Sequence, residues 1–355
     1  MKIEAMKYFI LAQILFLTRL VGFAQQVMLA DSITKTPVSF ATVYDADGTV
    51  IGRSNMCGCI RLQKGFEYHI SHIGCESKSL VYNGDSIIYL SPLSYTLSEV
   101  SVAANKKKYY HCKVYFRSIE HVDSCLKYYM DGIREFYIDT KSKKVHCGNV
   151  VTNYFMSKRQ DIAQKKRSIM IGDRYMALPF LDKSTLYEET MRDKKRKYKI
   201  PDIPSPTRSL SGIVYADSIS IGSCEVFSDK DEMLLSIDAL FPKTTLVTNL
   251  FGYTQVLSKH NKTELYRYSD FYAPSVFNLK ASNSYRHLAL THKKENLVRD
   301  IDVEDVFYVV EYEYTDTRES SSSELLQEKY KKYSEMFPVV ERIREQLVRE
   351  EIATF

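Results

Sequence analysis

Short runs in which apolar and polar positions alternate occupy the chain from residue 38 to residue 102. Alternation of this kind predicts β-strands with one buried face. The predicted strands cover residues 38–44, 49–51, 60–62, 66–70, 86–90 and 98–102. Four glycines stand in the turns around them, at Gly48, Gly58, Gly74 and Gly84. Short strands at regular spacing with turn signals are typical of a β-sandwich or a β-barrel.

Two of these glycines allow a specific expectation. We expect the backbone at the turn residues Gly58 and Gly74 to adopt a positive φ, a conformation that strains any β-branched residue. We therefore expect a Gly→Val substitution at either position to cost more than ~1 kcal/mol of folding free energy.

The next part of the chain has a helical period. Apolar residues spaced by three or four predict a helix over residues 116–129. Its apolar positions are Phe116, Ile119, Val122, Leu126 and Tyr129. Asp131-Gly132 can end this helix. Strands are then expected at residues 133–138 and 145–156 around a polar turn, a short helix at 157–170 and a loop at 192–209. A helix followed by a hairpin is typical of an α+β domain.

Strands dominate the pattern from Gly212 to Tyr314, most clearly at its end. One face of the last strand would carry Val306, Tyr308, Val310, Tyr312 and Tyr314, and the other Phe307, Val309, Glu311 and Glu313. An aromatic stripe of this kind can stack on a sugar ring or a base. We favour the commoner explanation, in which the stripe is a sheet face packed on helices.

A C-terminal helix is predicted after the polar linker of residues 318–323. Ser321 and Glu324 form a capping box. Leu326, Tyr330, Tyr333 and Phe337 make an apolar stripe, and Pro338 breaks or restarts the helix. The stripe favours packing on the protein's own sheet; docking into a partner's groove is the alternative.

Composition adds an export signal to this picture. The 355-residue chain is 45% hydrophobic and has 27 Tyr and no Trp, which suits a β-rich globular protein. Lys2 and Lys7 precede an apolar run, and Gly22-Phe23-Ala24 places small residues before Gln25. This pattern predicts a signal peptide over residues 1–24, cleaved after Ala24. An uncleaved anchor is the alternative, but Arg19 lies inside the run.

The net charge is too small to indicate nucleic-acid binding. The formal charge is +5 and falls to +3 once the signal peptide is removed. Residues 192–197 form the one strong basic block, which suits an exposed loop or, alternatively, contact with an acidic headgroup or glycan.

The seven cysteines include no Cys-x-x-Cys pair, and we expect most of them to be small buried thiols. A group of His and Cys residues at 111–112, 121, 125 and 146–147 contains zinc- and copper-type ligands. Its spacing matches no metal pattern, and adjacent His-Cys pairs on strands point to opposite faces. We therefore expect no metal site there.

Residues 26–103 also carry a linked series of motifs. The series comprises Asp31, Thr34, Pro37-Val38, Phe40-Ala41 and Val43; Ser54-Asn55, Gly58, Ile60 and Leu62; Ser71, Ile73 and Gly74; and Leu97, Glu99, Val100 and Val102. This order resembles the carboxypeptidase-like regulatory domains of exported Gram-negative envelope proteins. Ser54-Asn55, Ile60 and Cys75 depart from the family pattern, but only at turn and packing positions.

The resemblance implies a seven-stranded transthyretin-like sandwich without an active site, which would act as a scaffold or docking module. Members of the family often precede outer-membrane uptake transporters. The chain has no room for such a transporter, so the resemblance implies a partner of this machinery.

Enzymatic motifs are absent from the sequence. A zinc peptidase of the related kind needs His-x-x-Glu and a downstream His. His292 and Glu295 form the only His-x-x-Glu, and no His follows. Residues 291–296 fit a solvated loop, and we expect His292→Ala to leave folding intact. The chain also lacks a Gly-x-Ser-x-Gly elbow and Gly-rich phosphate loops.

The sequence therefore predicts a mainly β, exported protein of two domains. Residues 26–103 form a β-sandwich, residues 104–108 a linker, and residues 109–355 an α+β domain with mostly antiparallel sheet and a C-terminal helix. We expect a non-catalytic interaction or assembly protein in the periplasm or at the outer membrane, with no cofactor. The expected partner is an envelope protein. A glycan-binding protein and a hydrolase of unrecognised type are the alternatives. We expect no nucleic-acid binding and no transmembrane helix in the mature chain.

Overall fold

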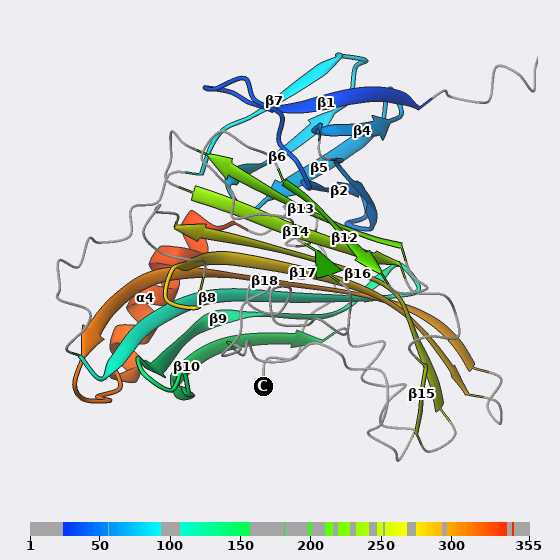
Figure 1. Cartoon of the computed structure of the whole chain (residues 1–355). Helices are drawn as coiled ribbons and strands as arrows, with labels where there is room; N and C mark the ends of the chain where they lie inside the picture. The colour runs from blue at the N-terminus through cyan, green and yellow to red at the C-terminus, as the bar shows by residue number, and fades with distance from the viewer. Residues whose placement is uncertain are drawn as a thin grey trace, which may run out of the picture. The chain divides into compact units, whose positions relative to one another are not determined.

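The chain folds into two compact units, unit 1 ending at Leu93 and unit 2 beginning at Ser94 (Figure 1). The computed structural model describes residues 24–55, 57–93, 107–156, 181, 198–199, 210–215, 219–227, 232–240, 247–250, 253–267, 275–292, 297–338 and 343. The expected signal peptide, the strand at 98–102, the short helix at 157–170 and the basic block at 192–197 lie outside the described residues. The expected loop at 192–209 does too, apart from residues 198–199.

Unit 1 contains two small sheets. The first has the order β4-β1-β7, from β1 (Gln25–Asp31), β4 (Cys59–Leu62) and β7 (Ile87–Leu90). The second has the order β3-β2-β5-β6, from β2 (Thr42–Asp45), β3 (Val50–Arg53), β5 (Glu67–His72) and β6 (Cys75–Val81). β1 runs parallel to β7, and the other paired strands are antiparallel.

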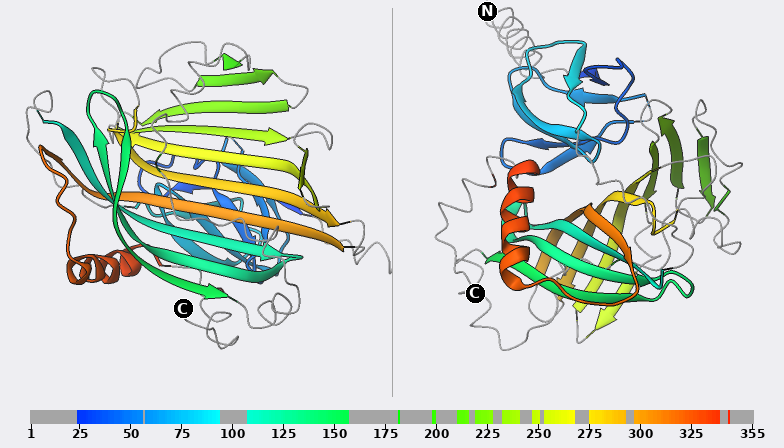
Figure 2. Two further views of the ribbon diagram at one scale, coloured as in Figure 1. Left: turned by 90° about the horizontal axis from the view of Figure 1, so that it is seen from below. Right: turned by 90° about the vertical axis from the view of Figure 1, so that its left-hand side faces the viewer.

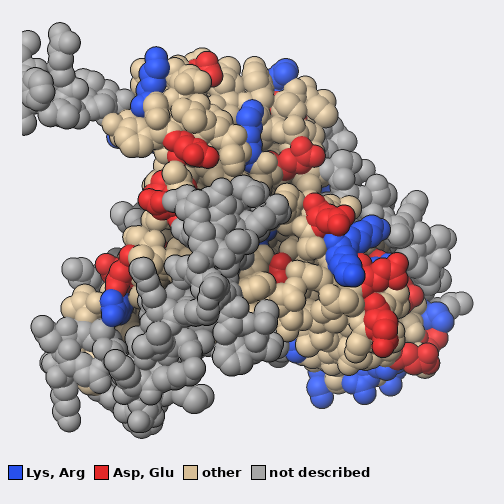
Figure 3. All heavy atoms as spheres, turned by 180° about the vertical axis from the view of Figure 1, so that it is seen from behind, with Lys and Arg blue, Asp and Glu red and all other residues tan. Residues whose placement is uncertain are grey.

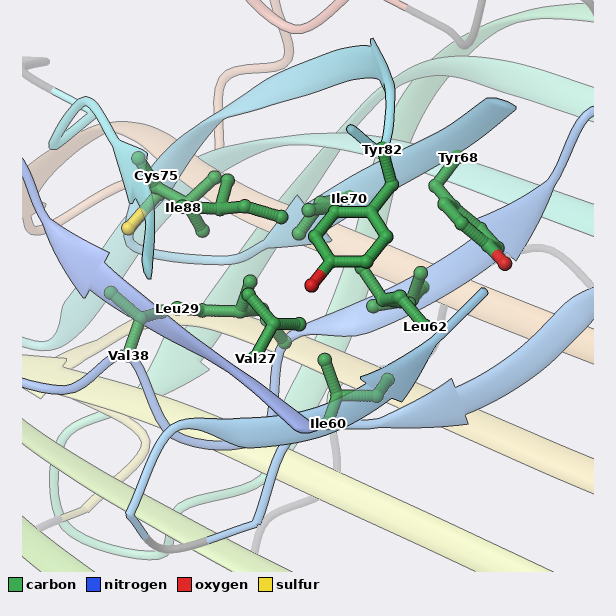
Figure 4. Packing of buried hydrophobic residues seen from close by; sticks show 13 residues of the cluster. Val27, Leu29, Val38, Ile60, Leu62, Tyr68, Ile70, Cys75, Tyr82 and Ile88 are labelled. Atoms are coloured by element: carbon green, nitrogen blue, oxygen red, sulfur yellow. The ribbon is translucent and has the colours of Figure 1, made fainter. Parts of the chain in front are cut away.

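The two sheets of unit 1 bury a shared apolar core (Figure 4). Leu29 from β1 and Ile70 from β5 are fully buried and face each other's sheets. Ile60 and Leu62 share the buried face of β4, as their alternation predicted. Burying a side chain of this size stabilises the fold by about 1.5–3 kcal/mol, so this core holds the two sheets together.

The turns of unit 1 are built on local hydrogen bonds. The carboxylate of Asp45 accepts from the backbone N–H groups of Asp47 and Thr49, and the side chain of Asn55 accepts from those of Cys57 and Cys59. Gly48, Gly58 and Gly84 have φ values of +81°, +69° and +101°. A Cβ on Gly58 would also lie 2.5 Å from the carbonyl oxygen of Leu29.

Gly74 differs from the other three. Its φ is not positive, and an added Cβ would approach only the His72 ring, at 3.3 Å. The expectation that Gly74 supplies a left-handed turn is therefore wrong. Gly65, with φ of +87°, has that conformation instead.

Two further details of unit 1 differ from the expected strands. β1 was not predicted, although it is the central strand of its sheet. β2 begins at Thr42 rather than at residue 38, because Phe40 adopts a φ of +62°. The guanidinium of Arg53 donates to the Phe40 carbonyl at 3.0 Å and so holds this bend.

Unit 2 is built on one long antiparallel sheet and a helix. The sheet path is β10-β9-β8-β18-β17-β16-β14-β13-β12-β11, with β15 paired to β16. The strands are β8 (Tyr109–Val122), β9 (Cys125–Asp139), β10 (Val145–Met156), β11 (Tyr198–Lys199), β12 (Leu210–Tyr215), β13 (Ile219–Phe227), β14 (Glu232–Leu240), β15 (Val247–Leu250), β16 (Tyr253–Arg267), β17 (Leu279–His292) and β18 (Leu297–Thr315). The mainly β fold with mostly antiparallel sheet is confirmed.

The prediction of a helix over residues 116–129 is wrong. Those residues lie in the β8–β9 hairpin, which turns at Asp123 and Ser124 with φ of +51° and +64°. Positive φ at both central residues matches the twist of the strands. Nearly every side chain of β8 is buried, on both faces of the sheet. A strand buried on both faces loses its two-residue alternation, and its apolar positions then imitate a helical period.

Gly132 does not end a helix but lies inside β9. A Cβ at this position would lie 2.1 Å from the backbone oxygen of Val151 and 2.9 Å from the Phe116 ring. Glycine is therefore required here by the close approach of β10. The expected turn at residues 139–144 and the strand at 145–156 are both confirmed.

The aromatic stripe of β18 is split between the two faces of the sheet. A β-bulge between Val309 and Glu311 shifts the register against β8. An extra residue in one strand reverses the side on which the following side chains lie. Tyr308 consequently stacks on Phe337, whereas Tyr312 and Tyr314 pack against Tyr110 on the opposite face. The expected single-faced stripe is wrong.

The C-terminal helix α4 (Ser323–Met336) is confirmed and packs on its own sheet, against β8, β9 and β10 (Figure 2). Its cap is one residue later than expected, because the Ser322 side chain accepts from the Leu325 N–H. Ser321 is instead bonded to Glu135. The helix ends at Phe337, just before Pro338. We call the sheet surface that contacts α4 the helix face.

Candidate binding cleft in unit 2

A cleft of about 460 Å³ opens at one end of the sheet in unit 2. Its walls come from the start of β8, the end of β9, the start of β10 and the segment after β18. The lining residues are Lys108, Tyr109, Tyr137, His146, Cys147, Asp316, Thr317, Arg318 and Ser320. The volume lies in the range of small-molecule sites.

Two cations converge on one aromatic ring in this cleft. Lys108 Nζ lies 5.1 Å and Arg318 Cζ lies 5.6 Å from the centroid of the Tyr109 ring. A ring face attracts cations through its quadrupole. Asp316, the one acidic lining residue, is paired with Lys107 at 2.6 Å. The charge of the lining is therefore positive.

His146 and Cys147 supply the wall from β10. The His146 ring packs edge-on against Tyr109. Burial, together with the nearby charges of Arg318 and Lys144, lowers the pKa of His146 below its ordinary value of 6.5. At neutral pH this imidazole is uncharged and can both donate and accept a hydrogen bond. The neighbouring Cys147 thiol is exposed.

A His–carboxylate pair lies beneath the wall formed by Tyr137. The His111 ring stacks on Tyr137 with centroids 4.3 Å apart. Its two ring nitrogens face Glu135 at 3.2 Å and Glu313 at 2.9 Å. Ser321 donates to Glu135 through its hydroxyl at 2.5 Å and its backbone N–H at 3.1 Å. Burial alone would raise the pKa of Glu135. The hydrogen bonds from His111 and Ser321 outweigh that effect and hold the pKa below its ordinary value.

The order of these groups is not that of a hydrolase triad. In a triad the imidazole stands between the hydroxyl and the carboxylate, so that it can take the hydroxyl proton. Here Glu135 stands between Ser321 and His111. Tyr137 is a weak proton donor at neutral pH, because burial and the charge of Glu135 raise its pKa to about 12. The network fixes the strand ends and the segment before α4.

Two other carboxylates, the buried Asp131 and the half-buried Glu311, anchor α4 to the helix face. Asp131 accepts hydrogen bonds from Tyr129 at 2.8 Å and from Tyr330 of α4 at 3.1 Å. Glu311 is bonded to Lys113 of β8, to Lys329 and to Tyr333. Burial raises the pKa of Asp131, whereas hydrogen bonds from Lys329 and the charge of Lys113 lower that of Glu311 despite its burial. These hydrogen bonds and ion pairs attach α4 to the sheet.

The His and Cys group that the sequence singled out is dispersed. His111 lies on the helix face, Cys112 in the core of the opposite face, and His146 and Cys147 in the cleft. Among the described residues, no three His, Cys, Asp or Glu side chains are placed to hold a metal ion.

His292 lies in β17 rather than in a solvated loop. It pairs with Tyr253 of β16 and is 8% exposed, so the expected loop is wrong at this position, and His292→Ala should destabilise the strand. Glu295 lies outside the described residues.

Most of the cysteines are not buried, contrary to expectation. Of the six whose side chains the structure describes, Cys75 and Cys112 are buried, Cys59 is half-buried, and Cys57, Cys125 and Cys147 are exposed; all six are free thiols. Burial raises the pKa of Cys112 to about 12.

The described surface offers neither a tyrosine platform from β18 nor a membrane-spanning helix. Tyr308 is buried under Phe337, and Tyr312 packs on Tyr110. No helix in the described part of the chain has the length and apolar character needed to cross a bilayer. Acidic and basic side chains lie close together on the face shown in Figure 3.

No protein-family model matches the chain, and no curated protein sequence matches it significantly. The candidate site therefore stands on its own geometry. Sequence reasoning treated Lys107 and Lys108 as a linker and residues 318–323 as another, and so missed the cleft that these two segments form.

Proposed function

We propose that this protein is an exported, non-catalytic interaction or assembly protein of the cell envelope. In this proposal unit 1 is a docking module and unit 2 holds a ligand or a partner segment in the cleft. The resemblance of residues 26–103 to carboxypeptidase-like regulatory domains and the N-terminal export pattern supply the envelope location. A component of the outer-membrane uptake machinery is the expected partner.

The single observation that supports the non-catalytic part is the hydrogen-bond network of His111, Glu135 and Ser321 beneath the cleft. His111 pairs with the buried Glu135 and with the exposed Glu313, and the His111–Glu135 pair is covered by Tyr137 and tied to Ser321. Catalytic acid–base groups must reach the reacting atom. The lining of the open cleft combines a pair of cations with polar side chains, an imidazole and a thiol, and we take this set to suit binding.

The docking role can be tested with matched surface variants. Phe66 in unit 1 and Val298 in unit 2 are large apolar residues that are 53% and 67% exposed. The tagged mature protein would be cross-linked in envelope extract and its partners identified. We expect Phe66→Ser to weaken capture of a defined envelope partner and Val298→Ser to leave it unchanged, with equal thermal melting of both.

The proposal fails if no envelope protein is captured specifically. It also fails if the purified chain turns over ester, peptide or glycoside substrates and loses that turnover in His111→Ala. That second result would favour the hydrolase alternative.

A further inference from the structure

We propose that the cleft in unit 2 binds an anionic group, a phosphate or a carboxylate, through Lys108 and Arg318. The inference rests on the proposed function only in taking the cleft as a binding site. It names the chemistry of the ligand, which the proposed function leaves open.

The charges that line the cleft are the first argument. Within the described residues, neither Lys108 nor Arg318 forms a salt bridge, and the charge of Asp316 is taken by Lys107. The guanidinium of arginine has a planar fork of donors that matches the oxygens of phosphate and carboxylate groups. Lys108 also interacts electrostatically with the carboxylate of Asp139. The excess of positive charge that remains in one concave site raises the local concentration of anions.

The placement of these cations is the second argument. Both stand over the same Tyr109 ring, at 5.1 Å and 5.6 Å. Tyr109 is buried and belongs to the start of β8. One buried ring on a rigid strand therefore contacts both cations. An anion that contacts both cations offsets the repulsion between these like charges.

Neutral donors complete the site. Thr317, Ser320 and His146 add polar side chains to the lining, and the Ser320 side chain is also hydrogen-bonded to Tyr137. Arg318, Lys144 and Lys108 all act to lower the pKa of His146, and Asp139 alone acts to raise it, which places the ring in a positive potential. Three other carboxylates lie near the cleft. Asp139 accepts N–H groups of its own turn, and Glu313 faces His111. Glu319 accepts the Tyr137 hydroxyl through its backbone oxygen, and the charge of its carboxylate acts on Tyr137.

The cleft is larger than a free anion. Its volume of about 460 Å³ leaves room for a sugar or a headgroup that carries the anion. The same chemistry can come from a phosphorylated small molecule, an acidic sugar or an anionic lipid headgroup, and the test separates these sources.

The test measures binding of three probes by the mature full-length protein. The probes are inorganic phosphate, glucuronate, and vesicles of phosphatidylglycerol compared with phosphatidylcholine. The variants are Lys108→Gln, Arg318→Gln and the double variant. The control is Lys331→Gln on the exposed side of α4, which removes the same charge at a residue that does not line the cleft.

We expect saturable binding of at least one probe, weakened about tenfold or more by each single variant, since a hydrogen bond to a charged group is worth that much. Lys331→Gln should bind as the wild type does. Raising the salt from about 0.02 M to about 0.5 M should also weaken binding. Equal affinity of the wild type and the double variant, or no saturable binding of any probe, would overturn the inference.

A second measurement keeps the inference testable if a variant does not fold. Cys147 lies in the cleft, whereas Cys125 is an exposed thiol in the β8–β9 turn. We expect the bound probe to slow alkylation of Cys147 in the wild type and to leave that of Cys125 unchanged. Equal alkylation rates of Cys147 with and without each probe would contradict the inference. Capture of an envelope partner without anion binding overturns this inference alone and leaves the proposed function standing.

Discussion

Units 1 and 2 bury their sheets by different means. The core of unit 1 is apolar, and Leu29 and Ile70 face each other's sheets within it. The helix face of unit 2 holds carboxylates that bond to partners on α4 and on neighbouring strands, such as the buried Asp131 and the half-buried Glu311. An apolar core forms from any side chains of suitable size, whereas a buried carboxylate is tolerated only with its specific partners. Unit 2 therefore depends more on individual residues.

The largest expected effect is in the apolar core. Leu29→Ala should cost about 2–5 kcal/mol, because it removes a fully buried side chain and leaves a cavity. Hydrogen exchange measured by mass spectrometry should show the loss of protection in peptides of unit 1. Val298→Ala, at an exposed site of unit 2, is the control. Equal loss of protection in both units would show that they do not unfold independently.

The second effect concerns the glycines of unit 1. Gly58→Val should cost more than about 2 kcal/mol, because valine is strained at a φ of +69° and its Cβ would collide with the Leu29 carbonyl. Gly74→Val should cost clearly less, since its φ is not positive. Urea unfolding of the two variants compares them directly. Equal destabilisation would show that the turn at Gly58 is wrongly described.

The third effect tests the polar attachment of α4. Glu311→Gln should cost about 1–2 kcal/mol, because Lys113 and Lys329 would then face each other without a carboxylate. Limited proteolysis should cut α4 faster in this variant. Lys331→Gln, on the same helix but with no salt bridge among the described residues, should be cut at the wild-type rate. An unchanged rate in Glu311→Gln would mean that apolar packing alone holds the helix.

The smallest effect is a change in pH dependence. The pKa of Glu135 is lower in the folded protein than its ordinary value of 4.5, so its contribution is present above that value. It is lost as the pH falls below 4.5 through the folded-state pKa. Asp131, whose pKa is raised, acts in the opposite direction.

Glu135→Gln should therefore lower stability at about pH 7 and make the fall in stability toward about pH 4 shallower. Urea unfolding at both pH values measures this. A wild-type slope in the variant would assign the acid sensitivity to other carboxylates.

The contrast between the units also explains what the sequence could reveal. β4 of unit 1 presents one face to the core and one to solvent, so Ile60 and Leu62 were correctly placed on one buried face. β8 is buried on both faces, and its polar residues Lys113 and Arg117 are paired with residues far along the chain. No local pattern records such pairs, so the hairpin was mistaken for a helix.

The cleft was missed for the same physical reason. Lys108, Tyr137, His146 and Arg318 come from four separate segments that only the sheet register brings together. The bulge in β18 is equally invisible in the sequence, because the alternation of residues 306–314 continues through it. The C-terminal helix was predictable because its stripe and its breaking proline are local.

The pairing of β8 with β18 has a consequence for how the chain folds. His111 and Glu313 face each other across this ladder although they are 202 positions apart in sequence. β8 can pair with β9 as soon as that hairpin has been synthesised, but its other edge stays open until β18 arrives. Closing so long a loop is slow, and an open strand edge meanwhile invites pairing with other chains. Unit 2 should thus complete its sheet only after residue 315 has emerged, which makes its folding late and places a demand on chaperones that unit 1 does not share.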